Sequence, residues 1–313
     1  MFSPAIPPAP RPALRASAGG AALLGLLLVV GALSCTRLVA SRVGRALDAQ
    51  GQVFAAEDDP ELVREAIPFG LKTLESLLEA SPRDPRLLQA AASGFTQYAY
   101  AFLLQEAQMQ EDHDPEAARA QTARARRLFE RAVAYGFRGL EARRKGVSEA
   151  LRTDPRAAVA TLGREDVPLL YWTGAALALR VSVSKDDMAQ VGRLPQAEAL
   201  LTRALALDPD WNDGAIHEFY LAYEGGRAER RAEATAHFDR VRALTGNQKL
   251  GPLVTWAETV CVQAQDAAGF HARLDQVLAF DADRAPRYRL VNLLAQRRAR
   301  WLKARAPDLF LEE

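Results

Sequence analysis

The chain has 313 residues, of which 49% are hydrophobic and 7% aromatic, so it can bury a sizeable core in one large domain or two ordinary ones. Its formal net charge of +1 shows no excess of basic residues that could bind nucleic acid, which excludes that class of partner. The two cysteines, Cys35 and Cys261, do not form the pattern of a disulfide framework, and we expect Cys261 to be a buried small hydrophobic residue.

Residues 1–34 have the order of a secretory signal peptide. Arg11 and Arg15 precede an apolar run from Ala21 to Leu33, and small residues follow the run. The run is shorter than the ~20 apolar residues that a membrane-spanning helix needs. The sequence therefore predicts a signal peptide over 1–34.

Cys35 ends this segment in the sequence Ala32-Leu33-Ser34-Cys35, which is similar to a lipobox. In a lipobox the cysteine thiol receives a diacylglycerol and the signal peptide is cut before the cysteine. We therefore expect lipidation at Cys35, with residues 35–58 as the attachment site and tether, and acyl chains that hold the protein stably on a membrane. An ordinary cleaved signal and an uncleaved anchor are the alternatives. Thr36 stands where an Asp retains lipoproteins in the inner membrane, which favours the outer membrane.

From Asp59 onward the chain is predicted to be one helical domain, residues 59–313. Apolar residues recur there at steps of three and four, as in a helix with one buried face. Examples are Ile67, Leu71, Leu74, Leu77 and Leu78; Leu200, Leu201, Ala204 and Leu207; and Leu274, Val277 and Leu278. No alternating stretch is long enough for a sheet, so the predicted fold class is all-α.

The helical domain contains an internal repeat with a period of about 36 residues. Related segments lie at 71–82, 197–209, 236–245 and 270–281, and other predicted helices separate them at 86–104, 123–140, 167–183, 214–224 and 251–264. Two helices per repeat at this period are typical of tetratricopeptide-like arrays, although the first-helix signature is missing. We expect an α/α superhelical array with at least three stacked helix pairs between Val167 and Asp281, and a concave surface for peptides, partner domains or small ligands.

Stretches over nearly the whole mature chain, in the expected order, resemble the T component of tripartite ATP-independent periplasmic (TRAP) transporters, the TatT family. They are Cys35 and the segments at 58–82, 93–102, 165–176, 184–187, 212–219 and 292–302. The resemblance implies a periplasmic, lipid-anchored, tetratricopeptide-like protein that partners the solute-binding receptor (P component) of a TRAP transporter. It also implies a homo-oligomer, with a trimer as the suggested size, and a hydrophobic or organic-acid ligand. The family has no established enzymatic activity, so the resemblance implies no catalytic residue and no cofactor.

Two motifs that point to metals are better explained as structure. His217-Glu218 on a helix would suit a zinc protease only with a second histidine one turn later, where Leu221 stands. We expect these two side chains to cap or bridge helices, with a pocket-facing role as the alternative. The segment Asp208-x-Asp210-x-Asn212 is similar to a calcium loop but lacks the required glycine and final carboxylate. We expect a helix–helix loop there, with Asn212 or Asp213 as the N-cap of the next helix.

Aromatic and arginine side chains supply the candidate ligand or partner site. Phe95, Tyr98 and Phe102 share one face of the helix 86–104, whereas Tyr100 lies off that stripe. We hypothesise one inner channel with an arginine near its mouth, since arginine recognises carboxylates by paired hydrogen bonds. The candidates are Phe95, Tyr98, Phe102, Tyr171, Trp172, His217, Glu218, Arg297 and Arg298. The alternative is that the aromatic residues are ordinary core and that the arginines form a solvated helix face.

These observations favour a transport accessory protein that docks a TRAP receptor. The alternative is a ligand-free scaffold for assembly of envelope proteins. A hydrolase is disfavoured because the sequence contains no paired metal ligands, nucleophile elbow or phosphate loop. A TRAP receptor or permease gene beside this one would support the first interpretation.

Overall fold

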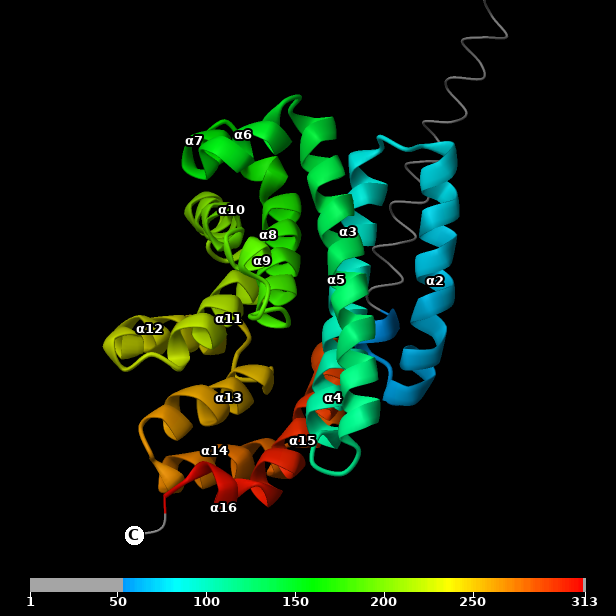
Figure 1. Ribbon diagram of the computed structural model, residues 1–313. Helices are drawn as coiled ribbons and strands as arrows, with labels where there is room; N and C mark the ends of the chain where they lie inside the picture. The colour runs from blue at the N-terminus through cyan, green and yellow to red at the C-terminus, as the bar shows by residue number, and fades with distance from the viewer. Residues whose placement is uncertain (1–52, 312–313) are drawn as a thin grey trace, which may run out of the picture. The chain divides into compact units, whose positions relative to one another are not determined.

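In the computed structural model, which describes residues 53–311, every regular element is a helix and no β-strand occurs within that range (Figure 1). The predicted all-α class is therefore confirmed. The predicted signal peptide 1–34, the lipidation site Cys35 and most of the tether 35–58 lie outside the described residues. Between residues 53 and 311, no helix combines the length and apolar character needed to cross a membrane.

The longer helices carry most of the packing. They are α2 (Pro60–Ala80), α3 (Pro85–Ala99), α5 (Pro115–Arg143), α8 (Val167–Ser182), α10 (Leu194–Leu207), α11 (Trp211–Gly225), α12 (Arg231–Leu244), α14 (Ala267–Ala279) and α15 (Arg289–Ala304). The shorter α-helices are α4 (Gln105–Gln110), α6 (Val147–Thr153), α7 (Pro155–Ala160), α9 (Met188–Val191), α13 (Gly251–Trp256) and α16 (Ala306–Leu309). Two π-helical turns interrupt long helices: η1 (Tyr100–Leu104) joins α3 to α4, and η4 (Ala257–Cys261) continues α13.

Asp-Pro pairs fix where several helices begin. The side chains of Asp59, Asp84, Asp114 and Asp154 accept hydrogen bonds from backbone N–H groups in the first turns of α2, α3, α5 and α7. The proline that follows costs no hydrogen bond, because a backbone N–H at the first position of a helix has no acceptor within the helix. Asp208-Pro209 acts differently: Asp208 ends α10, and the chain turns into α11.

Helices that follow one another in the chain pack side by side. Contacts join α2 to α3, α3 to α5, α5 to α8, and α8 to α10, and further along they join α11 to α12 and α13 to α14. The five helices predicted between the repeat copies fall in α3–η1, α5, α8, α11 and α13–η4, and the copies themselves fall in α2, α10, α12 and α14. Helix positions are thus confirmed, whereas the tetratricopeptide-like superhelix stays a prediction.

Small residues and buried clusters set how closely these helices pack. Gly136 of α5 lies against Thr173 of α8 at a separation that leaves no room for a β-carbon on the glycine. One buried apolar cluster extends from the end of α5 through α8 and α10 to the start of α11. A second extends from the end of α11 to α15 and contains Cys261, which is fully buried as predicted.

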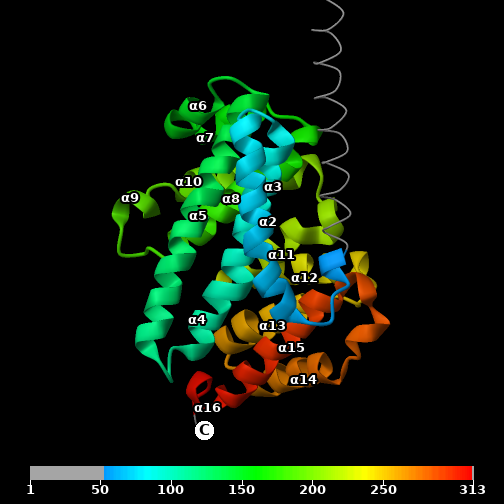
Figure 2. The ribbon, with the colours of Figure 1, turned by 90° about the vertical axis from the view of Figure 1, so that its right-hand side faces the viewer.

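The described helices also form a closed circuit of contacts. Helix α3 contacts α8, α8 contacts α11, α11 contacts α13, and α13 contacts α15. Helix α15 then contacts α4, which continues α3 through η1, and both views show α15 beside α4 (Figures 1 and 2). The circuit therefore brings helices that are far apart in the sequence into contact.

Candidate functional site

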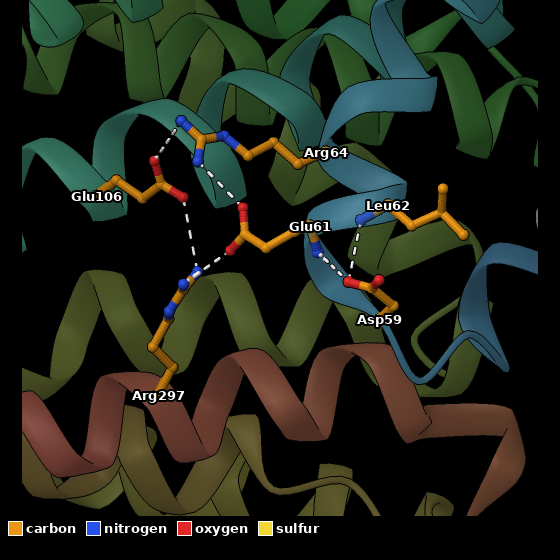
Figure 3. A network of polar contacts seen from close by, with 6 residues as sticks. All are labelled: Asp59, Glu61, Leu62, Arg64, Glu106 and Arg297. Carbon is orange, nitrogen blue, oxygen red and sulfur yellow. Dashed lines mark hydrogen bonds and ion pairs between the residues drawn. The ribbon is translucent and has the colours of Figure 1, made fainter.

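A network of four charged side chains joins the first described long helix to the last one (Figure 3). Arg297 of α15 lies 2.7 Å from Glu61 of α2 and 3.7 Å from Glu106 of α4. Arg64 of α2 lies 3.1 Å from Glu61 and 3.2 Å from Glu106. We call Glu61, Arg64, Glu106 and Arg297 the closure network, because it joins α2 and α4 to α15.

Local structure explains why the closure network forms at this place. Asp59 accepts hydrogen bonds from the backbone N–H groups of Glu61 and Leu62, at 3.0 and 3.1 Å, and so fixes the first turn of α2 (Figure 3). Glu106 is only 6% exposed, and its burial raises the pKa of its carboxyl group. The hydrogen bond from Arg297 lowers the pKa of Glu61. The network thus holds a buried carboxylate between two guanidinium groups.

Six side chains from six segments form a second group, which we call the inner cluster. They are Tyr100 of η1, Tyr171 of α8, Glu218 of α11, Lys249 before α13, Glu258 of η4 and Arg298 of α15. Desolvation is the main cause that raises the pKa of Tyr100, and a hydrogen bond with Gln105 lowers it; Glu258 and Glu218 raise this pKa further and Arg298 lowers it. Burial, Glu218 and Tyr100 raise the pKa of Tyr171.

Two ion pairs stand within the inner cluster. The Nζ atom of Lys249 lies 2.7 Å from an oxygen of Glu218. Arg298 is 6% exposed and donates to Glu258 from Nη2, with its Nε atom 3.4 Å from the second carboxylate oxygen. The guanidinium carbon of Arg298 lies 4.1 Å from the centre of the Trp301 ring, a cation–π distance. Arg297 and Arg298 are adjacent in the sequence, but Arg297 belongs to the closure network and Arg298 to the inner cluster.

The predicted aromatic stripe of α3 packs towards α5. The ring of Phe95 stacks on Tyr135 at 5.8 Å, and the guanidinium of Arg124 lies 5.9 Å from the centre of the Tyr98 ring. Tyr98 also lies 6.0 Å from Phe102, and Phe95, Tyr98 and Phe102 are all buried. Tyr100, which the helical periodicity left off this stripe, is instead the aromatic residue of this region that belongs to the inner cluster.

Tyr171 and Trp172 contact each other and a third aromatic ring. The rings of Tyr171 and Trp172 lie 4.9 Å apart, and Trp211 at the start of α11 lies 5.0 Å from Tyr171 and 6.4 Å from Trp172. Trp211 was not among the sequence candidates. The sequence feature that could have identified Trp211 is its position beside the repeat boundary at Pro209. The three rings join α8 to α11 next to the inner cluster.

His217 pairs with a histidine that the sequence did not connect to it. Its Nδ1 atom lies 2.7 Å from Nδ1 of His237 in α12, so one ring donates and the other accepts and is neutral. Burial lowers the pKa of both imidazoles. His237 also lies 3.6 Å from Glu224, which Arg230 contacts at 2.8 Å. Within residues 53–311, no three His, Cys, Asp or Glu side chains are arranged so that they could hold a metal ion together.

The segment just before His217 has an unusual backbone. Asn212, Asp213 and Gly214 all have positive φ angles, of 50°, 56° and 84°. Neither Asn212 nor Asp213 is the N-cap that the sequence predicted, because a left-handed turn at these residues replaces a capped helix start. Arg287 lies 2.6 Å from the Asp213 carboxylate, and the Tyr288 hydroxyl donates to it at 3.1 Å, which stabilises the turn.

Two surface grooves lie elsewhere on the described residues. The larger, of about 910 Å³, is lined by residues of α7, α10 and α11, and the smaller, of about 700 Å³, is lined mainly by residues of α5. Neither groove includes any of the nine candidate channel residues. The shared inner channel therefore stays a prediction, and the contacts described above support only parts of it.

Comparisons with known proteins show which family and which relative the chain is similar to. A family model described as "TRAP transporter T-component" matches residues 56–310. An "Uncharacterized protein" of Treponema pallidum (strain Nichols) is 31% identical over 272 residues, which cover 83% of this chain and 83% of the relative. The family match spans both the closure network and the inner cluster.

Proposed function

Because the chain belongs to the TRAP transporter T-component family, we propose that it is a lipid-anchored periplasmic accessory protein of a TRAP-type transport system. The observation that carries this proposal is the family match over residues 56–310, which is almost the entire helical unit. The N-terminal sequence up to Cys35 supports the lipid anchor. The role is one of binding, without catalysis.

In this role the protein docks the solute-binding receptor of the transporter and holds a hydrophobic or organic-acid ligand. Support comes from the inner cluster, where aromatic rings and a few polar groups converge from separate helices, as in small-molecule sites. The protein also forms a homo-oligomer, for which a trimer is the suggested size. Light scattering of residues 36–313 that shows a monomer at micromolar concentration would count against the oligomer.

The test of docking is direct binding between the full chain in lipid nanodiscs and the TRAP receptor encoded by the same genome. We expect saturable binding by interferometry, and none to a solute receptor of an unrelated transporter class. If the TRAP receptor also fails to bind, the docking proposal is wrong, and the scaffold interpretation replaces it.

A further inference from the structure

The larger surface groove, of about 910 Å³, lies on α10, and we call it the α10 groove. Helix α10 contacts both α7 and α11, and Figure 1 shows α10 between them. All three helices contribute side chains to the groove. A volume of this size is that of a site for a drug-sized molecule or for a few side chains of a partner protein.

Three half-buried aromatic side chains of α11 line the α10 groove: Phe219, Tyr220 and Tyr223. Phe219 stacks on Tyr223 with ring centres 5.8 Å apart, and it meets Tyr220 edge to face at 5.6 Å. The hydroxyl of Tyr220 lies 3.1 Å from that of Thr202 in α10. The hydroxyl of Tyr223 donates to Glu198 of α10 at 2.5 Å, so α10 holds both tyrosines in place. Aromatic rings fixed in this way lose little conformational freedom on binding, and such rings are common hot spots of protein interfaces.

Every carboxylate that lines the α10 groove has a partner within the described residues. Asp154 accepts a hydrogen bond from a backbone N–H in the first turn of α7 at 3.0 Å. Glu198 accepts from Tyr223, and Glu224 pairs with Arg230 at 2.8 Å. A cationic partner would therefore have to displace contacts that already stabilise the fold.

Two of the four arginines that line the α10 groove contact no carboxylate within residues 53–311. Arg203 donates to backbone carbonyl oxygens at and beyond the end of α7, and Arg230 is engaged as described above. In contrast, Arg156 of α7 and Arg227 after α11 are exposed and make no ion pair with a described residue. The guanidinium carbon of Arg227 lies 4.2 Å from the centre of the Tyr223 ring, a cation–π distance, so this free charge stands beside the aromatic rings.

Unpaired arginines beside anchored aromatic rings complement a partner that brings carboxylates together with an apolar side chain. We propose that the α10 groove binds an acidic segment of a partner protein, whose carboxylates pair with Arg156 and Arg227 while an apolar side chain packs on the aromatic rings. This inference rests on the proposed function, in which the partner is the TRAP receptor, and it names where that receptor contacts this chain. A protein segment is favoured over a lipid surface because a groove is concave and a bilayer is flat.

A peptide titration tests the chemistry of the α10 groove. The probes are two short fluorescein-labelled peptides with a central phenylalanine, flanked by glutamates in one peptide and by glutamines in the other. Each is titrated into the full chain in lipid nanodiscs, and fluorescence anisotropy reports binding. We expect the glutamate peptide to bind roughly tenfold more tightly than the glutamine peptide, because each free arginine gains a carboxylate. Arg156→Gln combined with Arg227→Gln should remove this preference.

The matched control replaces two exposed arginines outside the groove. Arg119→Gln combined with Arg300→Gln changes α5 and α15 at positions that make no ion pair with a described residue, and should leave both peptide affinities unchanged. The same two double variants are then compared for binding to the TRAP receptor encoded by the same genome. We expect the groove variant to bind the receptor roughly tenfold more weakly than the wild type, and the difference to shrink at high salt, which screens exposed pairs.

The possible outcomes separate the groove from the docking function. Equal affinity of the wild type for the two peptides, or a groove variant that binds the receptor as tightly as the wild type, would overturn the inference and leave docking intact. Anionic-lipid vesicles that bind the wild type but not the groove variant, without binding of either peptide, would assign the groove to a lipid surface and also overturn it. Failure of the wild type to bind the receptor would contradict the proposed function, and the peptides would still decide the groove.

Discussion

The closure network should make Arg297 a stabilising residue of the folded protein. Arg297→Met removes the 2.7 Å ion pair with Glu61, which is half-exposed and contributes about 0.2–1 kcal/mol. It also removes one of the two cations beside buried Glu106. Losing the partner of a buried charge can cost about 3–5 kcal/mol, but here Arg64 remains at 3.2 Å, so the effect is smaller.

We therefore expect Arg297→Met to lower the free energy of unfolding by about 1–2 kcal/mol, or Tm by about 3–6 °C. Arg300→Met is the matched control, since Arg300 lies exposed on the same helix and makes no ion pair with a described residue. Urea unfolding followed by circular dichroism measures both variants.

A double-mutant cycle separates the network from a general effect of losing an arginine. Combining Arg297→Met with Glu106→Gln should give a coupling energy of about 1 kcal/mol, because the two side chains act on one another. A coupling energy below about 0.3 kcal/mol, which is the usual error of additivity, would refute the reasoning.

Three further outcomes test other parts of the account. Cys35→Ala should lose incorporation of a labelled lipid precursor and be released from membranes, and unchanged labelling would exclude lipidation there. Gly136→Ala should lower unfolding free energy by about 1–3 kcal/mol because its β-carbon meets Thr173, whereas Gly226→Ala, which meets nothing, should be near neutral in the same unfolding measurement. Burial lowers the folded-state pKa of His237 below 6.5, so the unfolded state binds more protons and thermal stability should fall as pH decreases through about 6.5. His237→Gln should flatten the dependence of thermal stability on pH. An unchanged profile of Tm against pH in this variant would contradict the prediction.

Helix positions could be predicted from the sequence because helical periodicity is a local property, whereas the predicted N-cap at Asn212 or Asp213 was wrong. The period of about 36 residues and the three- and four-residue steps located the helices, and Asp-Pro pairs begin four of them. The predicted helix 86–104 corresponds to α3 and η1, and the predicted helix 251–264 contains α13 and η4. The local pattern was sufficient to locate helices, including the two that contain a π-helical turn.

The candidate site could be predicted only in part, because its geometry depends on how helices pack. Helical periodicity placed Tyr98 and Tyr100 on different faces of one helix, but which face meets which neighbouring helix depends on packing, and Tyr98 is the one that faces α5. Arg297 and Arg298 looked equivalent, yet one step of about 100° sends them to different networks. The pairing of His217 with His237 depends on how α11 and α12 pack, which no local pattern encodes.

Uptake of solute by the cell tests most directly whether this chain is an accessory protein of TRAP transport. A strain that lacks the gene should take up the labelled solute of its TRAP system more slowly than the parent. Wild-type protein should restore uptake, whereas Cys35→Ala, released from the membrane, should restore it poorly. Uptake that is the same with and without the gene would contradict the account.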